Sequence, residues 1–239
     1  MAMSKYTKNH KTITNMKKDS FSEAMTASLP IINLKNKTIG KLVPVGKWIL
    51  SDDKKIKNLT QWKKKYIKCF FSQYKPTIER TFWYLNNFSI KKNNRIFFLI
   101  FTNKNEFIGH IGLAGIEKRI ATLDNLIRGV SKGNSKLIHF SIFTILDWFF
   151  KNFETKKISG KIISYNSISV SLLKKIGFRI KEKTPLKKIK EINYIKINKN
   201  NKVKIEGINH IDTNLSDSNV KYVSIKILLD KNEFYNMNI

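Results

Sequence analysis

Residues 157–178 constrain the fold of this chain more than any other segment. An apolar run with strand character, residues 157–164, leads to Asn166 and then to a short amphipathic helical pattern over residues 167–176. The pattern stops at Gly177, which fits the position just after a helix, and a second strand-like run follows it. A strand, a polar residue at the start of a helix and a returning strand predict a helix packed against a sheet.

The segments before and after this unit predict the rest of that sheet. Three strand-like runs and a helix with apolar residues on nearly all sides come just before it, and further strand-like runs follow it. The expected elements are an edge strand at 38–44 closed by Pro44, a helix over 52–71 capped by Asp52 or Asp53, a helix from Thr77, an antiparallel meander at 95–102, 106–116 and 121–129, a buried helix over 135–151 and strands at 192–197, 203–208 and 221–229. This order predicts an α+β fold, with a mixed, mainly antiparallel sheet flanked by helices.

The chain divides into a tail and one domain. Residues 1–30 are polar with isolated apolar positions, which predicts a mobile or loosely docked arm. Residues 31–239 are long enough for a single domain with a sizeable core. Within that domain, residues 185–218 are expected to be an added C-terminal hairpin and loop before the last strand.

Composition narrows the class of protein. The formal net charge is +29, but lysine is spread over nearly every segment, which does not favour a dedicated nucleic-acid surface. A field of this sign would still attract an anionic cofactor. Cys69 is the single cysteine and the four histidines lack metal-site spacing, so neither an internal disulfide nor a metal is expected. With no apolar stretch typical of a signal peptide or a membrane span, we expect a cytoplasmic protein.

The loop Leu126-Ile-Arg-Gly-Val-Ser-Lys-Gly-Asn-Ser135 is a candidate anion site. A strand opens through two glycines into the buried helix, where free backbone N–H groups and the helix dipole attract phosphate. Arg128 and Lys132 are the expected charge partners. The alternative is purely structural: Gly129 ends the strand, and Asn134 or Ser135 caps the helix.

A histidine and a carboxylate fall on neighbouring strands of the meander. His110 should lie opposite or diagonal to Asp124 and Asn125, so that a His–carboxylate dyad could take a proton from an amine. The alternative is a structural histidine with Asp124 bonded locally.

Aromatic and polar residues gather upstream, in the helical region before the meander. Gln73, Arg80 and Trp83 could hold a sugar or a peptide, and could equally belong to the core and a solvated face. Asn125 is a fourth candidate for contact with the substrate.

The segment Asn166-Ser-Ile-Ser-Val-Ser-Leu-Leu-Lys-Lys-Ile-Gly-Phe178 resembles the cofactor motif of the GNAT superfamily of acetyl-CoA-dependent N-acetyltransferases. The resemblance covers residues 38–184 and the strand at 221–229. It implies that acetyl-CoA is bound by Asn166 and by the preceding strand and loop, namely Leu126, Ile127, Arg128, Gly129, Lys132, Gly133, Asn134 and Ser135. Leu173 stands where the family commonly has a tyrosine that protonates the leaving thiolate, so Tyr165, Ser171 or water would take that role.

The resemblance also implies direct attack of a primary amine on the thioester. The strands around His110 and Asn125 look like those of GNAT proteins that modify amino sugars, so an amino sugar, free or nucleotide-linked, is the leading acceptor. A protein N-terminus is the alternative acceptor, and a non-catalytic, polyanion-binding protein on the same scaffold is the alternative class. We expect a small-molecule amine as the partner and no association with a membrane. The sequence is compatible with either a monomer or a homodimer.

Overall fold

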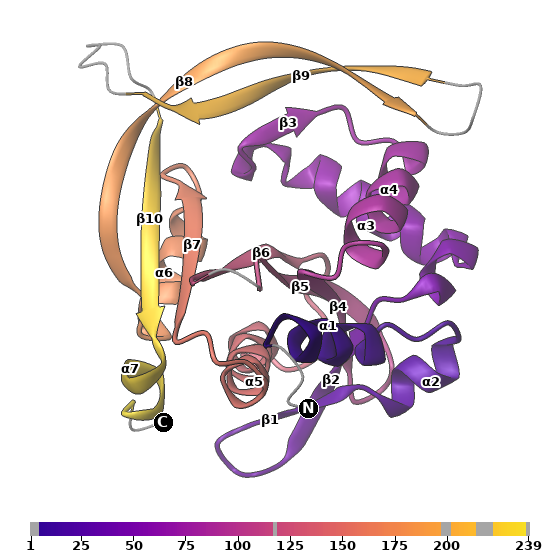
Figure 1. The fold of residues 1–239 in the computed structure, drawn as a ribbon, viewed down its shortest axis with the longest axis vertical. Helices are drawn as coiled ribbons and strands as arrows, with labels where there is room; N and C mark the ends of the chain where they lie inside the picture. Colours follow the sequence, from indigo (N-terminus) through magenta and orange to yellow (C-terminus); the bar gives the residue numbers. More distant parts are fainter. Residues whose placement is uncertain (1–4, 117–118, 197–201, 214–221, 238–239) are drawn as a thin grey trace.

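The computed structural model describes residues 5–116, 119–196, 202–213 and 222–237 (Figure 1). Its strands form one ten-stranded sheet in the order β1-β2-β4-β5-β6-β7-β10-β8-β9-β3. The strands are β1 (Leu29–Ile32), β2 (Thr38–Pro44), β3 (Ser72–Tyr74), β4 (Arg95–Thr102), β5 (Phe107–Ala114), β6 (Ala121–Arg128), β7 (Lys157–Ile163), β8 (Arg179–Lys196), β9 (Lys202–Asp212) and β10 (Val223–Asp230). The helices are α1 (Lys5–Met16), α2 (Phe21–Thr26), α3 (Asp53–Lys65), α4 (Ile78–Tyr84), α5 (Leu137–Asn152), α6 (Ser167–Lys175) and α7 (Lys231–Tyr235), with short helical turns η1 (Lys47–Ser51), η2 (Ile67–Cys69) and the π-helical η3 (Leu85–Ile90).

The two faces of the central strands bury separate apolar cores. In β4, Phe98 points into a core that is shared with α5 and α1, while Leu99 points into a second core against α3, η1 and α2. Both side chains are fully buried, because successive residues of a strand face opposite sides of a sheet. The sheet is mainly antiparallel, with β6 and β7 as its parallel pair, so the predicted fold class is confirmed.

Several helix boundaries follow the capping residues that the sequence offers. The side chain of Asp52 accepts a hydrogen bond from the backbone of Lys55 at the start of α3, and Thr77 does the same for Arg80 in α4. Gly177 has a φ of +86°, the left-handed conformation that ends α6. The expected helix over 52–71 is shorter than predicted, because α3 ends at Lys65 and the turn η2 follows it.

The first part of the chain differs from the predicted polar arm. Residues 5–26 carry the helices α1 and α2, and β1 adds a strand to the sheet. Ile13 and Ala24 are fully buried, so these helices are packed rather than loosely docked. Because β1 pairs with β2, the prediction that residues 38–44 form an edge strand is wrong. Pro44 is tolerated there as the last residue of the strand.

The C-terminal hairpin is longer than the sequence pattern suggested. The first part of β8 pairs with β10, and its second part pairs with β9 in a two-stranded ribbon. In Figure 1 this ribbon arches over the top of the view from β10 to β3, where Tyr74 pairs with Gly207. Residues 197–201 and 214–218 of the predicted hairpin and loop lie outside the described residues.

Candidate active site

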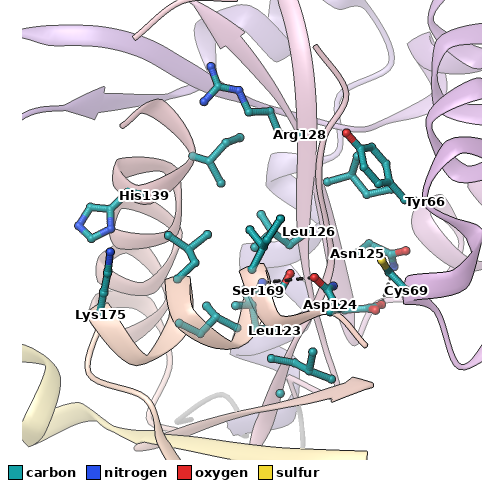
Figure 2. A pocket seen from close by; sticks show the side chains of 18 of the residues that line it. Tyr66, Cys69, Leu123, Asp124, Asn125, Leu126, Arg128, His139, Ser169 and Lys175 are labelled. Atoms are coloured by element: carbon teal, nitrogen blue, oxygen red, sulfur yellow. Dashed lines mark hydrogen bonds between the residues drawn. The ribbon is translucent and has the colours of Figure 1, made fainter. Parts of the chain in front are cut away.

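A cavity of about 1220 Å³ opens beside the place where β6 and β7 separate. The two strands are paired only at Ala121 and Thr122, opposite Ile158 and Ser159, and the rest of β6 lines the cavity. Figure 2 shows His139 and Lys175 on one side of the cavity, Tyr66 and Cys69 on the other, and Leu126 between them. Pockets for one small molecule commonly measure about 300–1,000 Å³, so this cavity is at the large end of ligand sites.

A bulge in β6 shapes the wall of the cavity. The register with β5 shifts between the pair His110–Ile127 and the pair Gly112–Asp124. Asn125, within this shift, has a φ of +52°, a left-handed conformation that asparagine tolerates better than most residues. The extra residue bends the strand. Asn125 and Leu126, the two residues of the bulge, both belong to the cavity wall, which also includes Arg128.

The loop between β6 and α5 is organised by Arg128. Its guanidinium donates hydrogen bonds to the carbonyl oxygens of Val130 at 3.3 Å, Lys132 at 3.2 Å and Ser135 at 3.0 Å. Arg128 thus holds the loop, in addition to bringing positive charge to the cavity wall. Lys132, the other expected charge partner, forms an ion pair with Glu106 at 2.9 Å and is not part of the lining.

The glycines of this loop permit close packing. Gly133 has a φ of +75°, and a Cβ atom placed there would lie 2.6 Å from Cγ2 of Thr102. A Cβ atom at Gly129 would lie 1.9 Å from the ring of Trp62. Neither position accepts a side chain without displacement of its neighbours.

The start of α5 fits an anionic group. The side chain of Asn134 accepts a hydrogen bond from the backbone of Lys136, so Asn134 sits just outside the helix as a turn residue. N–H groups of a first helical turn lack partners within the helix, and here Ile138 and His139 of that turn line the cavity. Lys136 and Ser135 line it as well. Phosphate groups of coenzyme A fit this combination of helix N-terminus and positive side chains.

Asn166 has a structural role at the start of α6. Its Oδ1 accepts a hydrogen bond from the backbone of Ser169 at 3.2 Å, and the residue also lines the cavity. Leu173, in the same helix, is buried and presents an apolar side chain to the cavity. Tyr165, a predicted catalytic residue, lies elsewhere: it is 54% exposed, its ring contacts Tyr222, and it is not part of the lining.

The predicted dyad of His110 and Asp124 is not formed. Nδ1 of His110 donates a hydrogen bond to the backbone carbonyl of Asn125 at 2.6 Å, while Asp124 forms an ion pair with Arg95 at 2.9 Å. Burial lowers the pKa of His110 to about 3, although its bond to the Asn125 carbonyl opposes the shift. The bulge contributes to the difference: the register of the pair Gly112–Asp124 would place His110 opposite Leu126 and diagonal to Asp124, but the extra residue places His110 opposite Ile127, one residue further from Asp124.

Asn125 joins this cluster to Tyr84, a residue that the sequence pattern did not single out. Nδ2 of Asn125 donates to the Tyr84 hydroxyl at 2.8 Å and to Asp124 at 2.7 Å. Burial and the nearby Asp124 carboxylate raise the pKa of Tyr84 to about 12, so the phenol is protonated at neutral pH.

The other predicted substrate residues lie away from the cavity wall. Gln73 donates hydrogen bonds to the carbonyls of Lys68 and Phe70, and Arg80 lies over the ring of Tyr74 at 3.9 Å. Trp83 packs on the small core between α4 and the ribbon. None of Gln73, Arg80 and Trp83 is part of the cavity lining.

The wall opposite α5 and α6 is built by Tyr66, Cys69, Phe70 and Phe71, which follow α3. Phe70 and Phe71 belong to the upstream aromatic stretch that the sequence offered as a contact for the acceptor, whereas Tyr66 and Cys69 were not singled out. The sequence pattern placed both of these in the expected helix over 52–71, but α3 ends at Lys65.

Lys63 lies behind this aromatic wall. Its Nζ is 2.9 Å from the centre of the Phe70 ring. Burial lowers the pKa of Lys63 to about 7, with Arg80 adding to the shift and Asp124 opposing it. The amine is therefore partly neutral at physiological pH.

Two further findings concern metals and membranes. Within the described residues, no group of three or more histidine, cysteine and acidic side chains could hold a metal ion. In the same part of the chain, no helix combines the length and the apolar character that crossing a lipid bilayer requires.

Solved structures share this fold at low sequence identity. A probable GNAT-family acetyltransferase from Chromobacterium violaceum is 8% identical with a TM-score of 0.57, over 83% of this chain and 86% of that one. A GCN5-related N-acetyltransferase from Brucella melitensis is 11% identical with a TM-score of 0.57, over 82% of this chain and 78% of that one. A spermidine N-acetyltransferase from Vibrio cholerae, in complex with CoA and spermine, is 12% identical with a TM-score of 0.55, over 78% of this chain and 94% of that one.

The sequence itself identifies the family. No curated protein sequence matches the chain, but residues 50–179 match the model of the acetyltransferase (GNAT) domain. That match spans more than half of the chain and contains β6, α5 and α6, the elements that line the cavity. The chain therefore belongs to the GNAT acetyltransferase family, as an N-acetyltransferase that uses acetyl-CoA.

Proposed function

We propose that the acceptor is an amino sugar, carried on a nucleotide or a similar anionic group. The observation that carries this proposal is the charge of the cavity. Among the described residues of its lining, Asp124 is the single carboxylate, and it is already paired with Arg95. The basic side chains of the lining include Arg128, Lys136 and Lys175. Arg128 and Lys136 lie at the end that we assign to the cofactor phosphates, so the choice of acceptor rests on the shortage of free carboxylates: one paired carboxylate offers little to a polycation and suits an acceptor with a single amine.

The aromatic wall supports the same acceptor class. Tyr66, Phe70 and Phe71 face the cavity across from α5 and α6. Aromatic side chains stack on sugar rings and nucleobases, and they provide apolar contact without adding charge.

Spermidine is the second candidate, because structurally similar proteins from Vibrio cholerae are spermidine N-acetyltransferases. A polyamine is held best by several free carboxylates, and the described lining supplies only Asp124. We therefore rank the polyamine below the amino sugar, with a protein N-terminus as a third acceptor to be tested.

The residues divide the work along the cavity. Acetyl-CoA supplies the acetyl group as an activated thioester. We assign its phosphates to the Arg128–Ser135 loop and the start of α5, and its pantetheine arm to the backbone of Leu126 and Ile127 and to Asn166. Asp124 orients the acceptor amine, which attacks the acetyl carbonyl directly: a C–N bond forms, the C–S bond breaks, and the proton that the amine loses passes to solvent water. Leu173 has no proton to donate, so water protonates the departing thiolate.

Calorimetric titration of acetyl-CoA into the wild-type protein is the first test. We expect micromolar binding that Asn166→Ala weakens and Gly133→Asp abolishes, because the second change places a carboxylate in the loop assigned to the phosphates and a Cβ atom 2.6 Å from Cγ2 of Thr102. Ser22→Asp, which adds the same charge on exposed α2, is the matched control and should bind like the wild type. A folded wild type that binds no acetyl-CoA would contradict the cofactor assignment and favour a polyanion-binding role.

An acceptor screen then tests the substrate. Release of free thiol is measured with a nucleotide-linked amino sugar, the free amino sugar, spermidine and an N-terminal peptide. We expect the highest kcat/KM with the nucleotide-linked amino sugar. A higher value with spermidine would refute the argument from the charge of the cavity.

A further inference from the structure

Three polar groups converge on Asn125 at the bulge of β6. Nδ1 of His110 donates a hydrogen bond to the backbone carbonyl oxygen of Asn125 at 2.6 Å. The side-chain amide of Asn125 donates to the Tyr84 hydroxyl at 2.8 Å and to the Asp124 carboxylate at 2.7 Å. We propose that His110 and Tyr84 are positioning residues for acetyl transfer, which hold Asn125 in its left-handed conformation and thereby fix the β6 wall of the cavity. The inference rests on the acetyltransferase function and deepens it. We call His110, Tyr84 and Asn125 the Asn125 network.

The conformation of Asn125 needs such support. A φ of +52° is sparsely populated for residues other than glycine, and it persists where the surroundings determine it. The backbone carbonyl and the side chain of Asn125 are each held by a separate partner, from β5 and from the end of α4. Rotation of the Asn125 backbone would break at least one of these bonds.

The bulge lies in the middle of the stretch of β6 that lines the cavity. That strand is paired with β7 only at Ala121 and Thr122. From Leu123 on, through the bulged residues Asn125 and Leu126, it faces the cavity. A change in the backbone at Asn125 would therefore move the stretch of strand that faces the reacting groups, and small misplacements of such groups slow a reaction strongly.

His110 is well placed to hold the strand and poorly placed to carry a proton. The side chain is 4% exposed and is not part of the cavity lining. Its ring lies against Phe97, with centroids 4.9 Å apart, and is stacked with Trp62 at 6.4 Å. Its Nδ1–H is used by the Asn125 carbonyl, which fixes the tautomer.

Tyr84 is held in turn by the helix that carries it. It lies at the junction of α4 and the π-helical turn η3, and its ring stacks on Phe88 of that turn with centroids 5.8 Å apart. Lys17, just after α1, donates to the carbonyl of Ile90 at the end of η3 at 3.0 Å. The first helix thus supports the turn from which the hydroxyl of Tyr84 reaches Asn125.

Hydrogen–deuterium exchange and steady-state kinetics together test the proposal. Tyr84→Phe removes the hydroxyl, His110→Leu removes the donor, and His110→Asn keeps a donor near the position of Nδ1. Tyr235→Phe is the matched control, because it removes a hydroxyl that bonds a side chain, Asp147, in a region remote from Asn125.

We expect faster exchange of the amides of residues 121–128 in Tyr84→Phe and His110→Leu, and wild-type exchange in His110→Asn and in the control. Loss of one neutral hydrogen bond should lower kcat about five- to tenfold, with the Kd for coenzyme A changed by less than about twofold. The acidic limb of the pH profile of kcat/KM should stay in place in His110→Asn.

Two results would overturn the proposal. Wild-type exchange of residues 121–128 in both Tyr84→Phe and His110→Leu would mean that the network does not hold β6. Loss of the acidic limb in His110→Asn would make His110 a proton carrier. If the wild type transfers acetyl to no amine, the function fails instead, and exchange still reports on the network.

Discussion

Mild acid should destabilise this protein through His110. Burial lowers the pKa of His110 in the folded protein to about 3, against the ordinary value of 6.5. Below pH 6.5 the unfolded chain binds a proton that the folded protein excludes, so stability is lost as the pH falls from 6.5 toward 3. At about 1.36 kcal/mol per pKa unit, acidification from pH 7 to pH 5 removes about 2 kcal/mol of the free energy of unfolding.

Urea denaturation at the two pH values measures this loss. Other groups titrate over the same range, so the informative quantity is the difference between the wild type and His110→Asn, which keeps a hydrogen-bond donor near the position of Nδ1 and removes the titration. The variant will be less stable at pH 7, but it should lose about 2 kcal/mol less than the wild type between pH 7 and pH 5. Equal losses in both proteins would show that His110 is hydrated or protonated in the folded state, and would refute the burial argument.

Four further outcomes follow from single contacts. Gly129→Ala would place a Cβ atom 1.9 Å from the ring of Trp62 and should cost about 1–3 kcal/mol in thermal unfolding; an unchanged Tm would contradict the packing. Asn166→Ala should cost about 1 kcal/mol in urea denaturation, because α6 loses its cap. Arg128→Ala should raise the Kd for acetyl-CoA about tenfold, which corresponds to a loss of about 1.4 kcal/mol of binding free energy, because the loop would no longer be held in place. An unchanged Kd would mean that the loop is ordered without Arg128. Burial lowers the pKa of Lys17 to about 8, so the unfolded chain holds more protons above that pH and stability should rise by up to about 3 kcal/mol between pH 8 and 10.5; Lys17→Met should flatten this rise in urea denaturation.

Local signals in the sequence predicted the elements that depend on local physics. The caps at Asp52, Thr77 and Asn166 are side-chain bonds to residues three positions ahead, so the sequence contains both partners. Gly177 likewise ends α6 with its own backbone conformation. The starts of α3, α4 and α6 and the end of α6 are therefore predictable from the order of residues, whereas α5 begins after Lys136 without the side-chain cap expected from Asn134 or Ser135.

What the sequence did not show depends on long-range contacts. The bulge at Asn125 changes which residue lies opposite His110, and nothing in the sequence indicates a positive φ at that asparagine. In the sequence, Ile13 and Lys17 belong to a segment that reads as a polar tail. Their burial depends on contacts with the central core and with η3, which are distant along the chain. The three residues of β3 are too few for any periodic pattern.

The pairing of β3 with β9 has a consequence for folding during synthesis. Tyr74 of β3 and Asn209 of β9 are 135 residues apart, yet a hydrogen bond of 3.2 Å joins their side chains. On a ribosome, α3 and α4 emerge with β3 between them long before its partner strand exists. The aromatic wall of the cavity, which leads directly into β3, therefore has no strand pairing to hold it until β9 has been synthesised. A nascent chain stopped before residue 207 would carry the whole GNAT-matched segment, but it would lack both the partner of β3 and β10, which pairs with β7 and β8. Both sides of the cavity are therefore completed only when the C-terminal strands have been synthesised.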